Sequence, residues 1–176
     1  ENGYAAYYDN VGLPQPDDPL FLPWLTGEKT PVDDDRLRAG LFNLGMGHDK
    51  DAIKRAVLEG IALNTAWIYS KVATLKSVNH EGPIPLVGGM GMYGTFVQNL
   101  ANSINRPIST ANPRFAGVLG AAALAAPALG WTDNVWEGAQ ICQSQFSTIV
   151  EPDPTQVIQS RHRQQRLAKL RKRLVK

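Results

Sequence analysis

The feature that most constrains the fold is an apolar strand that runs directly into a glycine-rich turn and then a helix. Residues 84 to 87 (IPLV) are short and apolar, GGMGMYG follows at residues 88 to 94, and Phe96, Val97 and Leu100 continue at helical spacing. Glycine has no Cβ, so the main chain can turn sharply and come close to a bulky ligand. The start of a helix offers unpaired N–H groups and a positive dipole end that suit phosphate. The pattern alone leaves two interpretations open, a tight turn or a nucleotide site, because it matches neither a P-loop nor a dinucleotide fingerprint.

Apolar segments alternate with helical segments on both sides of this turn. This alternation indicates an α/β fold in which strands and helices lie in layers. The helix at residues 117–129 is rich in alanine and is expected to be tightly packed and buried. Strands are expected at residues 21–25, 39–44, 84–87 and 107–110, and the other helices at residues 50–76, 96–104 and 155–175.

Positive charge gathers at the C-terminal end of the chain. The formal net charge is only +2, yet residues 161–176 hold eight of the 18 Lys and Arg residues and no acid. Leu167, Leu170 and Leu174 recur at helical spacing in this segment. We therefore expect one face of the helix to dock on the domain while its cations stay solvated. Binding of nucleic acid by this basic helix is the less favoured alternative.

Several other classes of site are disfavoured. The one cysteine, Cys142, cannot form an intrachain disulfide, which suits the reducing cytoplasm. No apolar run is long enough to span a membrane, no signal peptide is recognisable, and the histidines lack zinc-ligand spacing. The acidic run at residues 33–35 is expected to be a solvated loop rather than a Mg²⁺ site. Because the first residue is Glu1 and not Met, we expect a fragment of a longer protein.

Five segments, in order and spacing, resemble the C-terminal portion of the FGGY carbohydrate kinase family, and most closely its xylulokinase-type (pentulose kinase) members. The resemblance covers about residues 20–130. The segments are FLPWLTGEKTP (21–31), RAGLFNL (38–44), KRAVLEGIALN (54–64), VGGMGMYGTFVQNLANSINRPI (87–108) and AGVLGAAALAA (116–126).

The resemblance implies an actin-like ATPase architecture, with two domains of ribonuclease H-like topology and ATP in the cleft between them. Residues 1–150 would be an incomplete second domain, which binds nucleotide, and residues 151–176 a basic helix docked on it. By the same resemblance, nucleotide-binding positions are Gly88, Gly89, Met90, Gly91 and, on the adjoining helix, Gln98, while Gly117, Gly120 and Ala121 pack at the interdomain hinge.

The resemblance also implies what the parent enzyme does. It would transfer the γ-phosphoryl group of ATP, bound with Mg²⁺, to a hydroxyl of a sugar, and the expected sugar is a pentulose such as xylulose. The family's catalytic Asp, sugar pocket and phosphate loops lie upstream of the matched segments, so no residue of this chain is assigned a catalytic or metal-binding role. The chain would then be inactive alone, with the missing N-terminal kinase domain as its partner, and a homodimer is also compatible with the resemblance.

Five residues depart from the family pattern. Met90 stands where the family has glycine or another small residue, and Phe115 stands where an acidic residue is common. Met92 and Tyr93 replace a polar position, and Lys29 replaces an arginine. These changes leave a second interpretation open, in which the same fold serves as a non-catalytic scaffold or assembly domain.

Overall fold

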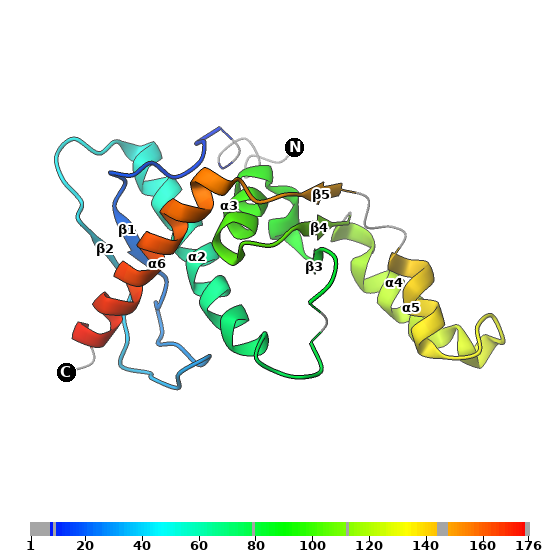
Figure 1. Ribbon diagram of the computed structural model, residues 1–176. Coiled ribbons are helices and arrows are strands. Elements are labelled where there is room, and N and C mark those ends of the chain that lie inside the picture. The colour runs from blue at the N-terminus through cyan, green and yellow to red at the C-terminus, as the bar shows by residue number, and fades with distance from the viewer. Residues whose placement is uncertain (1–7, 9, 79, 112, 144–147, 175–176) are drawn as a thin grey trace.

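One long helix, α2 (Lys50–Val72), lies between a two-stranded sheet and the shorter helix α3 (Gly94–Ile104) (Figure 1). The structure is a computed structural model that describes residues 8, 10–78, 80–111, 113–143 and 148–174. In the first sheet, β1 (Leu20–Leu22) pairs antiparallel with β2 (Gly40–Phe42). In the second, β3 (Ile84–Leu86) pairs parallel with β4 (Ile108–Thr110), and β4 pairs antiparallel with β5 (Thr148–Val150). The other elements are the 3₁₀ helices η1 (Gly89–Met92) and η2 (Pro127–Leu129) and the α-helices α4 (Pro113–Ala125), α5 (Val135–Gln143) and α6 (Pro154–Leu174).

Local sequence fixes where α2 begins and how closely β1 approaches it. The Asp49 carboxylate accepts hydrogen bonds from the N–H groups of Asp51 (3.0 Å) and Ala52 (2.8 Å), which caps the helix. Gly60 lies buried in the middle of the helix, and a Cβ there would collide with the carbonyl of Phe21. The glycine that weakens the helix intrinsically therefore lets β1 pack directly on it.

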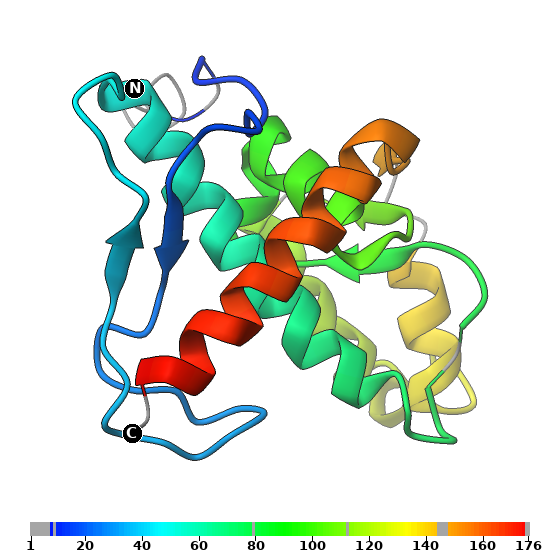
Figure 2. The same cartoon turned by 60° about the vertical axis from the view of Figure 1, so that its left-hand side comes forward.

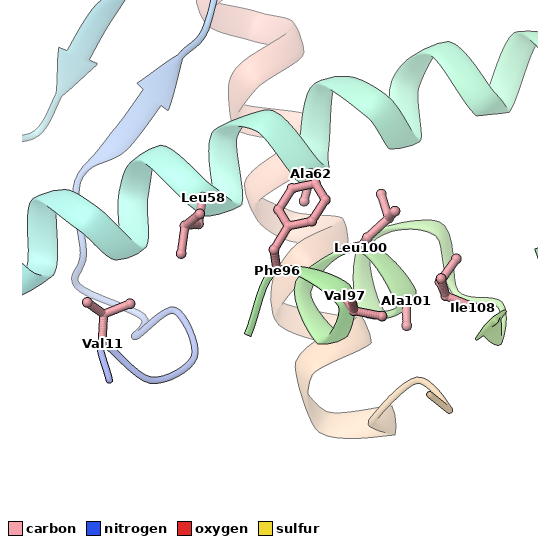
Figure 3. Close-up of a cluster of buried hydrophobic side chains, with 8 residues drawn as sticks. All are labelled: Val11, Leu58, Ala62, Phe96, Val97, Leu100, Ala101 and Ile108. Atoms are coloured by element: carbon pink, nitrogen blue, oxygen red, sulfur yellow. The ribbon is translucent and has the colours of Figure 1, made fainter. Parts of the chain in front are cut away.

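Two apolar clusters hold the elements together. Figure 3 shows the first, in which α3 packs between α2 and β4, and its members are Val11, Leu58, Ala62, Phe96, Val97, Leu100, Ala101 and Ile108. The second joins the first sheet to α2 and α6, and its members are Leu20, Leu22, Trp24, Leu37, Leu63 and Leu167. The first cluster fixes the place of the glycine-rich turn, because α3 follows that turn directly.

A buried ion pair ties α6 to the rest of the fold, across which it lies in Figure 2. Arg163 on α6 is 3% exposed and Glu59 on α2 is 1% exposed. The guanidinium lies 2.5 Å from both oxygens of the Glu59 carboxylate and also donates to the carbonyls of Asp18 (3.0 Å) and Pro19 (2.9 Å). Burial raises the pKa of the Glu59 carboxyl, and the hydrogen bond and charge of Arg163 oppose that rise.

A second ion pair fixes the segment that leads into β1. Two nitrogens of Arg55 donate to the two oxygens of Asp18, each at 2.7 Å, and the N–H of Gln15 donates to the same carboxylate at 2.8 Å. Burial alone would raise the pKa of Asp18. The hydrogen bonds from Arg55 and Gln15, together with the charges of Arg55 and Arg163, outweigh burial and lower this pKa below its ordinary value.

The expectation of a buried alanine-rich helix is wrong. In Figure 1, α4 and α5 project together from the far side of the second sheet, and most of α4 faces solvent. Val118 is 65% exposed and Leu124 is 69% exposed. The helix ends at Ala125, and Gly130, with φ of 69°, instead caps the following η2. An apolar composition predicts that a helix is buried. It does not show whether the residues that would pack against the helix belong to the same segment of chain.

Most of the other expected elements are confirmed, although the strands and α2 are shorter than expected. The four expected strands correspond to β1 to β4, and α2 ends at Val72 rather than near residue 76. Asn105 ends α3 in the left-handed conformation with φ of 58°. The short elements α5 and β5 were not expected, because residues 135–143 and 148–150 are brief and carry little periodicity. No helix in the described ranges has both the length and the apolarity that crossing a bilayer requires.

The charged segments behave as solvated or paired groups. On α6, Leu167 is buried and Leu170 packs against the same cluster, whereas Leu174 is 46% exposed. In the acidic run, Asp33 pairs with Lys29 at 2.7 Å and Asp34 pairs with Arg36 at 3.0 Å. The described part of the chain contains no group of three or more His, Cys, Asp or Glu side chains placed to hold a metal ion.

We predict that Arg163→Met destabilises the fold by about 3–5 kcal/mol, because it leaves Glu59 buried without its partner. Chemical denaturation of the chain measures this. Arg161→Met, an exposed arginine on the same helix, is the matched control and should stay within about 0.5 kcal/mol of wild type. Equal costs for the two variants would contradict the structural role given to Arg163.

A lowered pKa at Asp18 implies a specific pH dependence. The ionised carboxylate stabilises the folded state above its unfolded pKa, ordinarily 3.8, and this contribution is lost as pH falls through the lower folded pKa. The difference in unfolding free energy between wild type and Asp18→Asn should therefore be full above about pH 5 and shrink progressively below it. Urea denaturation at a series of pH values checks this, and a difference that grows toward acid pH would contradict it.

Candidate functional site

The turn after β3 requires glycine at its first position. Gly88 has φ of 103° and ψ of 177°, a backbone conformation that is essentially restricted to glycine. Apart from chain neighbours, no atom of the described residues lies within 4 Å of where a Cβ would stand on Gly88 or Gly89. Both glycines are exposed, and the N–H of Gly91 donates to the Gly88 carbonyl at 3.1 Å, which closes the turn. The main chain at this bend is thus open to a ligand.

The opposite side of the turn is anchored in the core. Met90 and Tyr93 both pack against the first apolar cluster, and the Tyr93 ring meets the Tyr8 ring edge-on with centroids 5.7 Å apart. The Met90 side chain therefore faces the core and does not crowd the open side of the turn. What Met90 can offer a ligand is its main-chain N–H. That N–H and the one of Gly89 have no hydrogen-bond partner within the described residues.

The helix that follows the turn, α3, has neither a side-chain cap at its N-cap residue, Tyr93, nor an acid in its first turn. The Val97 N–H donates to the Tyr93 carbonyl at 3.0 Å, so the helix begins directly after the turn. The dipole of such an end attracts negative charge, and phosphate is the common biological anion that binds there.

An apolar hollow of about 290 Å³ adjoins the turn. It begins at Val87, next to Gly88, and continues between the second sheet and the α4–α5 hairpin. Its lining residues are Pro85, Val87, Ala111, Ala116, Leu119, Gly120, Ala123, Ala139 and Cys142. Small side chains leave room for a flat ring, and the volume is near the lower limit of known small-molecule sites. The apolar hollow therefore lies beside the main-chain N–H donors of Gly89 and Met90.

The residues expected from the sequence occupy three different places. Gly88, Gly89 and Gly91 form the turn, and Gly120 on α4 lines the hollow. Gln98 lies elsewhere: its amide nitrogen donates to the Asn102 side chain at 3.0 Å and to the Glu151 carbonyl at 2.8 Å. These two bonds tie α3 to the segment between β5 and α6. A role of Gln98 in a base pocket therefore stays a prediction without a contact that supports it.

The three hinge positions lie on α4, as expected, and Gly120 among them also borders the open hollow. Gly117, Gly120 and Ala121 are exposed, and neither glycine has a non-neighbouring described atom within 4 Å of a Cβ position. Their role at a hinge stays a prediction. Sequence reasoning missed the hollow itself, because part of its wall, Ala139 and Cys142, comes from α5, whose helical character was not recognised. The quoted segment AGVLGAAALAA did contain a usable signal, since Ala116, Gly120 and Ala123 recur at the spacing of one helix face.

The chain is similar to known proteins both in sequence and in structure. The model of the C-terminal domain of the FGGY family of carbohydrate kinases matches residues 6–129. A xylulose kinase from Staphylococcus epidermidis is 33% identical over 117 residues, which is 66% of this chain and 23% of that protein. The structure of ligand-bound xylulose kinase from Lactobacillus acidophilus superposes with a TM-score of 0.80 at 27% identity and covers 97% of this chain and 34% of that one. A gluconate kinase from the same organism superposes with a TM-score of 0.76, also at 27% identity, over 96% of this chain and 34% of that one.

These comparisons confirm the expected α/β fold, which is the actin-like ATPase fold of sugar kinases. They also show that the chain spans only about a quarter of the length of the curated relatives it matches. The family consists of phosphotransferases that act on carbohydrates, and the glycine-rich turn and both helices beside it fall inside the matched range. The chain therefore belongs to the FGGY family of carbohydrate kinases, of which it contains C-terminal domain sequence.

Proposed function

We propose that this chain is the ATP-binding lobe of a cytoplasmic carbohydrate kinase, with a pentulose such as xylulose as the sugar. The observation that carries the proposal is the open main chain at Gly88 and Gly89, placed between an apolar hollow and an uncapped helix end. The hollow suits the adenine ring, and the open main chain and the helix end suit the phosphates. These features lie in the same order as the corresponding groups of ATP.

The adenine ring fits the apolar hollow. Ala116 and Gly120 of α4 line one wall, and Val87 at the end of β3 lines the other. Stacking of a flat ring against such small side chains buries apolar surface without steric hindrance. The phosphates then extend along the turn, where the N–H groups of Gly89 and Met90 and the positive end of α3 face them.

The chemistry of the reaction comes from ATP, whose γ-phosphoryl group is transferred to a sugar hydroxyl. This chain contributes position and electrostatics: donors of the turn and the end of α3 hold the nucleotide while the apolar hollow excludes water from its base. Mg²⁺ would be held by the phosphates and by the rest of the kinase, since the described residues offer no cluster of metal ligands. The catalytic base and sugar pocket are likewise assigned to the amino-terminal part of the enzyme.

The sugar is the least constrained part of the proposal. Xylulose is favoured because the similar proteins from Staphylococcus epidermidis and Lactobacillus acidophilus include xylulose kinases, although a gluconate kinase is similar as well. The alternative of a non-catalytic scaffold loses part of its basis, because Met90 faces the core and does not obstruct the turn. Nucleic-acid binding by α6 loses support too, because Arg163 and Leu167 of its basic segment are buried in the domain.

We predict that Gly89→Ala leaves stability unchanged but weakens ADP binding by about tenfold or more, since a methyl group would stand where the nucleotide approaches the main chain. A titration of the chain with ADP, followed by the amide resonances of Gly88, Gly89 and Gly91 in nitrogen–proton NMR spectra, measures this. Gly47→Ala, in the loop before α2, is the matched control because its Cβ would also meet no described atom and its φ is not positive.

A companion variant separates backbone strain from loss of binding. Gly88→Ala should destabilise the fold by about 1–3 kcal/mol, because alanine does not adopt the Gly88 conformation without strain. Thermal denaturation of the three variants gives the comparison. If the glycine amide resonances of wild type do not shift at millimolar ADP, the proposed nucleotide site is overturned. If Gly47→Ala loses as much affinity as Gly89→Ala, ADP binding is not linked to this turn.

A further inference from the structure

A cavity of about 520 Å³ lies at the start of β3, whereas the glycine-rich turn follows the end of that strand. Its walls come from α2, from one face of the second sheet and from the connection between α2 and β3, which Figure 1 shows as a long loop. We call it the Arg106 pocket, and its polar lining residues are Tyr69, Glu81, Arg106 and Ser109. Among the described residues, Pro85 alone lines both this pocket and the apolar hollow. The pocket is therefore a second, separate cavity of a size that small molecules occupy.

Arg106 supplies a positive charge that is held in one orientation. Its Nη1 donates to the Tyr69 hydroxyl and its Nη2 to the Gly82 carbonyl, each at 2.6 Å. Both of these acceptors are neutral, and no carboxylate of the described residues forms an ion pair with Arg106. A guanidinium carries further N–H donors beyond these two. A half-buried guanidinium with a fixed plane and no counter-ion is suited to bind a planar carboxylate.

Ser109 adds a buried hydroxyl group on the same side of the sheet. The residue is 5% exposed, yet its hydroxyl has no hydrogen-bond partner in the part of the chain that the structure describes. Side chains alternate across a strand, and the neighbouring Ile108 packs in the first apolar cluster. The Ser109 side chain therefore points away from that cluster and into the pocket that it lines. Since buried hydroxyl groups normally have a partner, the partner of this one stands in the pocket.

Most of the remaining wall is apolar. Pro85 on β3 and Ile149 on β5 are the register partners of Ser109, so these three residues lie on one face of the sheet. Ile149 is 54% exposed, and Val78 and Ile84 complete the apolar lining. A ligand that fits this wall carries an apolar body next to its charged group.

Glu81 limits the charge that such a ligand can carry. This exposed residue lines the same pocket, and its carboxylate repels an anion. The repulsion is stronger for a phosphate ester, whose charge at neutral pH approaches two, than for a carboxylate with a single charge. One guanidinium and one hydroxyl are matched by the two oxygens of a carboxylate. The pocket therefore selects a monocarboxylate over a phosphate ester.

We propose that the Arg106 pocket binds a small apolar monocarboxylate. The guanidinium of Arg106 and the hydroxyl of Ser109 donate to its oxygens, and its apolar body lies on Pro85 and Ile149. This site is additional to the proposed kinase function and does not rest on it. Because β3 leads from this pocket directly to Gly88, the ligand would lie at the opposite end of the strand from the nucleotide site.

The test titrates this chain, without nucleotide, with three probes that share one ring and differ in the attached group. Benzoate carries one negative charge, benzamide is neutral, and phenyl phosphate carries more than one. Nitrogen–proton NMR spectra follow the amide resonances of Gly82 and Ser109. The variants are Arg106→Gln and Ser109→Ala. The matched control is Arg38→Gln, because Arg38 also donates to two main-chain carbonyls at 2.6 Å but is not among the residues that line the pocket.

We expect benzoate to shift both resonances saturably, with a dissociation constant on the order of a millimolar because so small a ligand makes few contacts. Arg106→Gln should weaken benzoate binding by about tenfold or more and Ser109→Ala by about fivefold or more, whereas Arg38→Gln should change it less than about twofold. Ser109→Ala removes no hydrogen bond between described residues, so it decides the test even if Arg106→Gln does not fold.

Three results would overturn the proposal. The first is no saturable shift with benzoate at tens of millimolar, or an undiminished affinity in Ser109→Ala. The second is benzamide binding as tightly as benzoate, which would mean that the charge of Arg106 does not select the ligand. The third is tighter binding of phenyl phosphate, which would replace the carboxylate by a phosphate ester. Because no nucleotide is present, a failure of ADP to bind the glycine-rich turn leaves all of these results unaffected.

Discussion

The packing of α3 between α2 and β4 is the contact on which the rest of the structure depends. Phe96 and Leu100 of α3 meet Leu58 and Ala62 of α2 in the cluster shown in Figure 3. Because the glycine-rich turn is joined directly to α3, this contact determines where the turn lies and which way it opens. Met90 adds a second attachment from the turn itself. A flexible sequence of glycines is thereby held in one place, which is what binding a ligand by main-chain groups requires.

Elements with a local chemical signature were predictable from the sequence. Asp49 marks the start of α2, Asn105 marks the end of α3, and the strand before Gly88 reads directly from its apolar residues. Gly88 was expected to permit an unusual backbone, and its φ of 103° shows that it does. These predictions succeed because caps, left-handed residues and glycine turns depend on a few neighbouring residues.

Features that depend on distant contacts were not predictable in the same way. The pairing of Arg163 with Glu59 joins residues 104 positions apart, and the charge pattern of α6 gave no sign that one arginine of its basic segment would be buried. The prediction that α4 is buried was wrong, because an apolar composition does not show which surface, if any, of the same segment covers the helix. The hollow depends on how α4 and α5 meet at Gly138, which no local pattern describes. Tertiary packing decides such cases.

The central claim is that nucleotide binds along the open side of the turn at Gly88 and Gly89. A crystal structure of this chain with ADP tests it most directly. The account predicts adenine in the hollow between Val87 and Gly120, with phosphate oxygens within hydrogen-bond distance of the Gly89 and Met90 N–H groups. Density for ADP at any other surface, with the turn and hollow filled only by solvent, would contradict it.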